Sequence, residues 1–301
     1  MKNIDILCIG ETLIDFIGNE TDATLQQTTG YKRLLGGSPT NVAFNAAKLG
    51  LRAAIVSTVG NDGLGHFALR ELEQGGVNTQ YSRTANSANT SIVMVSRSTG
   101  TPDFIAYRDA DVHIEDYQLA DTVLQNAHVY HTTCFALSKK PAQHTIVTKA
   151  KRAKELGLQL SIDLNYSDRI WPERQEAMDI IQLYCSYNPL IKISEDDCFR
   201  IFNEEKSEAF IFDYFHSHGA DTVCLTKGKD GVVLSDRNTG IIKQDAQRLD
   251  NIHDTTGAGD AFWTGFLYAR LKGYNFTDTL TLAQKIAGLK LQNIKNWETI
   301  L

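Results

Sequence analysis

The sequence has little of what would mark a membrane, secreted or nucleic-acid-binding protein. Its apolar runs stay short of the ~18–20 residues that a membrane span needs, and its first ten residues lead into a strand-like segment without a signal-peptide pattern. The formal net charge is −6, whereas a nucleic-acid partner would favour a basic face. We therefore expect a cytoplasmic protein with no membrane and no nucleic-acid partner.

Cysteine is scarce and follows no pattern. The five cysteines are odd in number and scattered, and several lie in apolar segments, which is typical of reduced core thiols in a cytosolic protein. No Cys/His spacing suggests zinc. Proline-rich linkers, internal repeats and low-complexity tracts are also absent, so we expect residues 1–301 to form a single domain.

What the chain does have is a regular alternation of apolar runs and amphipathic stretches. We expect strands at 4–9, 53–59, 129–133, 158–163, 190–193 and 223–226. Helices are expected at 65–74, 142–156, 173–185 and 207–218, with a last one from 277 to about 293. Such alternation predicts an α/β fold, in which a mostly parallel sheet carries helices on both faces.

Two segments, at about 12–35 and 88–108, break this alternation. They contain strand-like runs at 13–17, 31–35 and 91–96 with little helix between them. Periodicity alone does not separate a small covering sheet from an ordinary pair of hairpins.

The stretch from Asp254 to Asp260 (DTTGAGD) carries the clearest chemical signal. Small residues let the backbone approach a ligand where a helix begins, and free amides at a helix N-terminus attract anions. Asp260 would oppose an anion unless it has a role of its own, such as accepting a proton from an attacking hydroxyl. The pattern favours phosphoryl transfer to an alcohol, and a purely structural helix cap is the alternative. It matches neither a dinucleotide fingerprint nor a Walker loop.

A second constellation, Gly36 to Ala43 (GGSPTNVA), lies about two hundred residues upstream. The glycine pair predicts a turn whose backbone can approach a small ligand, with Pro39 in the first turn of a helix and Ser38 as its cap. Asn41 would then present an amide, which can both donate to and accept from sugar hydroxyls. An ordinary loop-to-helix junction would have the same residues.

Together with Gly50 and Gly60 at the expected intervals, these two stretches resemble the signatures of the ribokinase-like (PfkB-type) carbohydrate kinase family. The resemblance covers nearly the whole chain and is nearest to fructokinases and 2-keto-3-deoxygluconate kinases. Thr264 departs from it, because a smaller residue is usual there. The resemblance implies a three-layer αβα sandwich with a small β-sheet lid over the sugar site, and it allows a homodimer formed through the lid.

The resemblance also implies a set of residues around the sugar. Asp15 matches an acid that binds sugar hydroxyls, and a turn aspartate is the alternative. Arg108 matches an arginine that often contacts the sugar, and an exposed loop arginine is the alternative. The full sugar-binding set implied is Asp15, Gly36, Gly37, Asn41, Tyr107, Arg108 and Asp260.

For ATP, the implied residues are Asn165, Lys192, Ser194, Thr226, Gly228, Gly231, Gly257 and Gly259. The segment 163–171 resembles D-x-N-x-R-x-x-x-W, but Ser167 replaces the arginine and Arg169 comes two residues late. The segment 226–231 resembles a T-x-G-x-x-G nucleotide loop, although a hairpin turn with two glycines would look the same.

Metal sites are implied in two places. Ser194 and Asp197 replace the Asn and Glu of the family's N-x-x-E motif, which organises Mg²⁺ and phosphates through water; both remain oxygen ligands suited to a hard cation. An acidic helix start would explain them equally well. Asp254 and Thr256 match positions that lie near a monovalent cation, such as K⁺, in many relatives.

The implied activity is transfer of the γ-phosphoryl group of ATP to a primary sugar hydroxyl. Asp260 would accept the proton, and amides around Gly257, Ala258 and Gly259 would stabilise the developing charge. The missing arginine at Ser167 favours a neutral sugar, because an acidic sugar needs a charge partner. Fructose comes first and 2-keto-3-deoxygluconate second, with ribose, tagatose phosphate or a nucleoside as further alternatives.

Two other activities are less favoured. A phosphofructokinase-type activity would need an extra basic cluster for the substrate phosphate, and the sequence shows none. The motif departures also leave open a catalytically weak, sugar-binding regulatory protein. The intact Gly257–Asp260 stretch argues against it, because such a protein has no need for a carboxylate in an anion site.

Overall fold

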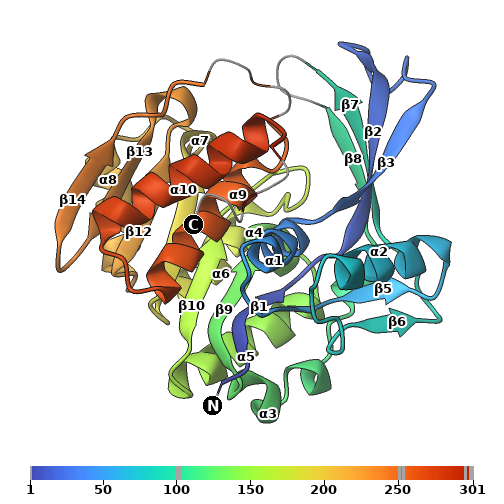
Figure 1. Ribbon diagram of the computed structural model, residues 1–301, viewed down its shortest axis with the longest axis horizontal. Helices are drawn as coiled ribbons and strands as arrows, with labels where there is room; N and C mark the ends of the chain where they lie inside the picture. The colour runs from blue at the N-terminus through green and yellow to red at the C-terminus, as the bar shows by residue number, and fades with distance from the viewer. Residues whose placement is uncertain (1, 99–102, 250–251, 253–254, 295–296, 298–301) are drawn as a thin grey trace.

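The computed structural model describes residues 2–98, 103–249, 252, 255–294 and 297. Among these residues, the largest element is an eight-stranded sheet in the order β14-β13-β12-β11-β10-β9-β1-β4 (Figure 1). The strands from β4 to β12 in this order run parallel, whereas β13 and β14 pair antiparallel at one edge. Their bounds are β1 Ile4–Ile9, β4 Ala53–Val56, β9 Ala127–Thr133, β10 Gln159–Asp163, β11 Leu190–Ser194, β12 Thr222–Thr226, β13 Val232–Asp236 and β14 Gly240–Gln244.

Helices cover both faces of this sheet because its strands are apolar on both sides. In β1, Ile6 and Cys8 pack into one core with α1, α2, α9 and α10, while Leu7 and Ile9 pack into another with α5, α6, α7 and α8. This arrangement confirms the expected three-layer αβα sandwich. The helices are α1 Ser38–Lys48, α2 Gly63–Gln74, α3 Asp121–Leu124, α4 Cys134–Leu137, α5 Ala142–Glu155, α6 Arg174–Cys185, α7 Glu195–Phe202, α8 Glu208–Ser217, α9 Ala258–Leu271 and α10 Phe276–Leu291.

A separate small sheet lies above α2, at the upper right of Figure 1. It has the order β3-β2-β7-β8 and is built from the two segments that break the sequence alternation. β2 pairs antiparallel with β3 and parallel with β7, and β7 pairs antiparallel with β8. The bounds are β2 Leu13–Thr21, β3 Tyr31–Gly36, β7 Ile92–Arg97 and β8 Phe104–Tyr107.

Two differences from the expected strands concern the edges of the central sheet. The strand expected at 53–59 is divided at Ser57, whose hydroxyl accepts a hydrogen bond from the Thr12 amide at 3.0 Å. Beyond it, β5 (Thr58–Gly60) leaves the central sheet and pairs with β6 (Arg83–Ala85). The hairpin of β13 and β14 was not expected, because β14 is largely exposed and so has little apolar periodicity.

The expectation for the cysteines agrees with the structure. All five cysteines are buried and unpaired with one another, as predicted for core thiols. Within the described part of the chain, no helix combines the length and apolar character that a membrane crossing requires.

The sheet brings distant polar residues to a common edge. Asp163 is the register partner of Lys192, and Ser194 is the partner of Thr226. Asp163, Ser194 and Thr226 are the last residues of β10, β11 and β12, and the carboxyl ends of parallel strands are where open α/β sheets bind their ligands.

Candidate active site

Asp260 is the residue on which the two sequence constellations converge. It lies in the first turn of α9, whose N-cap, Gly257, has a left-handed backbone with φ of 72°. The Ser38 hydroxyl donates to Asp260 Oδ1 at 2.6 Å, and Asn41 Nδ2 donates to Oδ2 at 2.8 Å. The start of α1 therefore holds the Asp260 carboxylate at the start of α9.

The surroundings of Asp260 raise the pKa of its carboxyl group. Burial and the charge of Asp163 raise the pKa of Asp260 to about 6, although the hydrogen bonds from Ser38 and Asn41 act in the opposite direction. A carboxylate with that pKa is mostly ionised at neutral pH and is more basic than an ordinary aspartate, as a proton acceptor requires.

Ser38 does not have the role expected from the sequence. The N-cap of α1 is Gly37, with φ of 104° and no side-chain cap bond, and Ser38 is already helical. A Cβ on Gly37 would overlap the carbonyl oxygen of Glu11, so only glycine fits this turn. The serine hydroxyl is thereby released to bind Asp260.

Lys192 and Asp163 form an ion pair beneath the first turn of α9. Lys192 Nζ lies 2.8 Å from both carboxylate oxygens of Asp163, and both side chains are buried. Burial lowers the pKa of Lys192, but the charges of Asp163 and Asp197 more than offset this, so its pKa lies above the usual value. A Cβ on Gly259 would lie only 3.3 Å from Lys192 Nζ, so the glycine allows the turn to lie directly over the ammonium.

Asp15 lies on the face of the small sheet that is turned to this site. Burial, followed by the negative charge of Asp260, raises the pKa of Asp15 to about 7. Gly36 is required beside it, because a Cβ there would overlap the Asp15 carboxylate. The predicted residues Asp15, Gly36, Gly37, Asn41 and Asp260 are thus brought together.

Glu11 is a member of this site that the sequence prediction did not include. It follows β1, and Glu11 Oε1 accepts a hydrogen bond from the Ser38 amide at 2.9 Å. Burial raises its pKa to about 8, so Glu11 is largely protonated at neutral pH. A glutamate directly after a buried apolar strand was the sequence signal that could have identified it.

Arg108 is turned inward rather than left on an exposed loop. It forms a buried ion pair with Asp111, in which Arg108 Nη2 lies 2.5 Å from Oδ2. Its Nη1 donates to the Phe135 carbonyl at 2.9 Å and to Ser138 Oγ at 2.5 Å. The neighbouring Tyr107 is 56% exposed.

The register of the small sheet separates Tyr107 from the sugar-side residues. Asp15 pairs with Val93, and Val93 pairs with Ala106. Because side chains alternate along a strand, Tyr107 lies on the face opposite Asp15. The prediction that Tyr107 contacts the sugar is therefore not supported by its position.

The segment after β10 also differs from its expected arrangement. Asn165 Oδ1 accepts a hydrogen bond from the Phe135 amide at 3.2 Å. Arg169 does not take the place of the arginine missing at Ser167, because it forms an ion pair with Asp103 at the start of β8. The arginine expected near the phosphates is thus neither present at position 167 nor supplied from position 169.

The predicted nucleotide residues follow β11 and β12. Thr226 closes β12, and Gly228 and Gly231 form the turn of the β12–β13 hairpin with φ of 54° and 92°. The backbone of residues 226–231 is thus the two-glycine hairpin turn that the sequence analysis gave as the alternative to a nucleotide loop. Its position, next to Ser194 in the sheet register, still places it at the same edge as Asp163 and Lys192.

Asp197 is built into a helix cap. Its Oδ2 accepts hydrogen bonds from the Ser194 amide at 3.1 Å and the Ser194 hydroxyl at 2.5 Å, and its Oδ1 lies 3.2 Å from Arg200 Nη1. Burial raises its pKa to about 6. Both oxygens already have partners, which fits the acidic helix start better than a direct metal ligand.

The described residues contain no cluster of three or more His, Cys, Asp or Glu side chains arranged to hold a metal. For the monovalent cation, Thr256 is exposed just before α9, and Asp254 lies outside the described residues.

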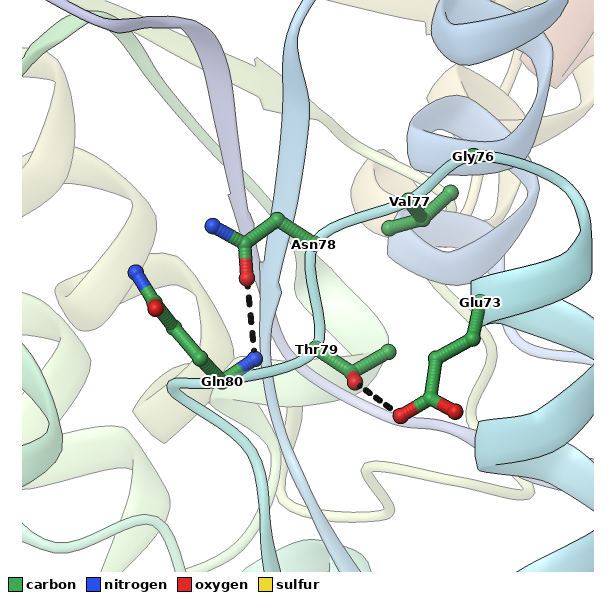
Figure 2. Close-up of a pocket in the computed structure, with 6 residues that line it drawn as sticks. All are labelled: Glu73, Gly76, Val77, Asn78, Thr79 and Gln80. Carbon is green, nitrogen blue, oxygen red and sulfur yellow. Dashed lines mark hydrogen bonds between the residues drawn. The ribbon is translucent and has the colours of Figure 1, made fainter.

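A shallow depression with a volume of about 490 Å³ lies away from this site, at the end of α2. Figure 2 shows two hydrogen bonds among its lining residues: Thr79 Oγ1 donates to Glu73 Oε1 at 2.7 Å, and the Gln80 backbone amide donates to Asn78 Oδ1 at 3.0 Å. We assign it no ligand.

Comparisons with known proteins show which proteins this chain resembles. The chain is 36% identical over 293 residues to an ATP-dependent 6-phosphofructokinase of Thermoanaerobacterium thermosaccharolyticum, covering 97% of this chain and 89% of that protein. It matches the solved structure of the Halothermothrix orenii fructokinase with a TM-score of 0.80 and 32% identity, covering 96% of this chain and 98% of that one. An uncharacterized sugar kinase from Pyrococcus horikoshii, solved in complex with ATP, matches with a TM-score of 0.85 and 26% identity, covering 97% and 94%.

The family profile described as pfkB family carbohydrate kinase matches residues 3–296, nearly the whole chain. Because this match covers nearly the whole chain and these relatives are 36% and 32% identical to it, the chain belongs to the pfkB family of carbohydrate kinases and is a phosphotransferase.

Proposed function

We propose that this protein transfers the γ-phosphoryl group of ATP to a primary hydroxyl of a small neutral sugar, with fructose as the first candidate. The observation that carries the proposal is the Asp260 carboxylate, held by Ser38 and Asn41 at the N-terminus of α9. It combines a proton acceptor with an anion site made of the free amides at the start of a helix.

In the proposed reaction, Asp260 accepts the proton of the attacking sugar hydroxyl. A bond forms between that oxygen and the γ-phosphorus, and the bond to the bridging oxygen of ADP breaks, which leaves a sugar phosphate and ADP. Amides of Gly257, Ala258 and Gly259 stabilise the charge on the phosphoryl oxygens. A lid formed by the small sheet would exclude water as a competing acceptor.

Bound Mg²⁺ would supply charge neutralisation on the phosphates of ATP. Asp197 could orient water around such an ion, because both of its oxygens have protein partners and neither is free for direct coordination. A monovalent cation near Asp254 and Thr256 and a homodimer through the small sheet stay predictions.

Charge in the site favours a neutral substrate. Asp15 and Asp260 are acidic groups close enough to raise the pKa of Asp15. Arg108 is neutralised by Asp111, and Arg169 by Asp103. An acidic sugar would therefore meet carboxylates, and neither Arg108 nor Arg169 would be free to balance its charge. This supports fructose over 2-keto-3-deoxygluconate.

Fructose 6-phosphate is a second candidate acceptor. It is favoured by the 36% identity to the 6-phosphofructokinase relative, although the described site shows no basic cluster that would bind a substrate phosphate. A single panel of acceptors separates the two candidates.

The first experiment is a coupled ADP-release assay with Mg²⁺-ATP and fructose, fructose 6-phosphate, 2-keto-3-deoxygluconate, ribose, tagatose and adenosine. The Asp260→Asn variant should keep its fold and bind ATP, but its kcat should fall by at least ~10²-fold, because the proton acceptor is lost. Asp121→Asn, which removes a surface carboxylate paired with Arg152, serves as the matched control.

Wild-type turnover in Asp260→Asn would overturn the assignment of Asp260. Bound ATP without turnover of any acceptor in the panel would instead support the catalytically weak, sugar-binding alternative.

A further inference from the structure

Lys290 lies beside the first turn of α9, although nothing in the family signatures assigns it a role. It belongs to the last turn of α10, which packs along α9 (Figure 1). A Cβ placed on Gly257 would lie 3.3 Å from Lys290 Cε and 3.8 Å from Nζ, and also 3.8 Å from Asp260 Oδ2. The ammonium and the Asp260 carboxylate thus flank the same glycine.

Lys290 has no carboxylate partner among the described residues, whereas Lys192 and Arg169 near the site are ion-paired. Lys192 is neutralised by both oxygens of Asp163, and Arg169 is bound by Asp103. Within the described residues, Lys290 makes no side-chain hydrogen bond and no ion pair, and it is only half-buried. An unpaired ammonium beside free helix amides adds to their attraction for an anion.

We propose that Lys290 binds the γ-phosphoryl group of ATP at the N-terminus of α9. This proposal deepens the proposed kinase function and rests on it. Lys290 supplies a positive charge to a site in which the arginine at position 167 is replaced by serine. Because charge on the phosphoryl oxygens is stabilised by nearby cations during transfer, the ammonium assists both ATP binding and the chemical step.

A structural role for Lys290 has to be separated from this electrostatic one. The lysine stem also covers the Gly257 turn, and a long side chain can contribute by packing alone. Lys290→Met keeps most of that stem and removes the charge, whereas Lys290→Arg keeps a charge. Lys272→Met, which removes an exposed lysine at the other end of α9, is the matched control.

The test measures the Kd of ATP and of ADP by calorimetry without sugar, followed by kcat with the best acceptor. In Lys290→Met, the Kd of ATP should rise about tenfold, the effect of one lost charged contact. The Kd of ADP, which lacks the γ-phosphoryl group, should change much less. The kcat at saturating ATP should also fall by at least about tenfold, and Lys290→Arg should recover most of both losses.

An unchanged Kd of ATP in Lys290→Met, with its Tm equal to that of the wild type, would overturn the proposal. An equal loss of ATP and ADP affinity would also overturn it, because it would indicate packing or adenine contacts rather than the γ-phosphoryl group. Failure of the kinase proposal would be a separate result, because the wild type would then be inactive with every acceptor. The Kd values of ATP and ADP could still be compared between the wild type and Lys290→Met.

Discussion

Neighbouring groups shift the pKa of Asp260 in opposite directions. Burial and Asp163 raise its pKa, while the hydrogen bonds from Ser38 and Asn41 lower it, and the balance lies at about 6. The carboxylate has to be ionised to accept a proton, so the hydrogen bonds that stabilise its charge also set the pH at which it can act.

We expect kcat/KM to rise with pH through an acidic limb near 6, the pKa of Asp260. Ser38→Ala removes a hydrogen bond to the charged carboxylate, so the limb should move upward by about one pH unit. A pH profile of kcat/KM checks this, with Ser186→Ala, which removes an exposed hydroxyl, as the control. An unmoved limb in Ser38→Ala would show that another group controls it.

At the scale of the element, α9 is attached to the sheet by a buried polar contact one turn after Asp260. Trp263 Nε1 donates to Ser161 Oγ at 2.9 Å, and Ser161 also bonds to His131 Nδ1 at 2.9 Å. Burial, followed by the charge of Lys192, lowers the pKa of His131 to about 3, so this histidine is neutral. Thr264, the departure from the signature, bonds to the Asp260 carbonyl at 2.7 Å within the same turn.

Trp263→Phe should therefore disturb the position of Asp260. The change removes the donor to Ser161 and should lower the free energy of unfolding by about 1–3 kcal/mol. It should also reduce kcat by about tenfold or more, because small misplacements of a reacting group are costly. Urea unfolding and kcat are the measurements, and Ser161→Ala should reproduce both effects in weaker form. Normal stability together with normal kcat would refute this attachment.

At the scale of the whole molecule, the fold buries the Glu11 side chain and partly buries that of Asp15. Burial raises the pKa of Glu11 to about 8 and that of Asp15 to about 7. Both groups hold protons in the folded state that they would release in the unfolded chain. Their contribution to stability is therefore complete below about pH 4 and is lost as the pH rises to about 8.

Glu11→Gln should flatten the dependence of stability on pH. Between pH 5 and 8, one such group can lower the free energy of unfolding by at most about 1.4 kcal/mol per pH unit. The urea midpoint of the wild type should thus fall more steeply over this range than that of the variant. If the urea midpoints of the wild type and Glu11→Gln fell equally with pH, burial would not raise the pKa of Glu11 as stated.

The sequence by itself determined the layered α/β fold and the start of α9. An apolar run such as Ile4–Ile9 predicts a strand from residues that are close together in the sequence, so it can be recognised without knowledge of the fold. The glycines before Asp260 likewise indicate a helix start with free amides. The roles of Ser38, Glu11 and Lys290 were not predicted from these patterns.

Only the tertiary structure decided which side chains meet. Ser38 and Asn41 reach Asp260 across 222 and 219 residues of sequence. Arg108 turns inward to Asp111 instead of remaining an exposed cation, and Lys290 comes to lie beside Gly257. These contacts depend on strand order and on the packing of α10 against α9. Local periodicity sets the direction of a side chain on its own element, but not which element packs opposite it.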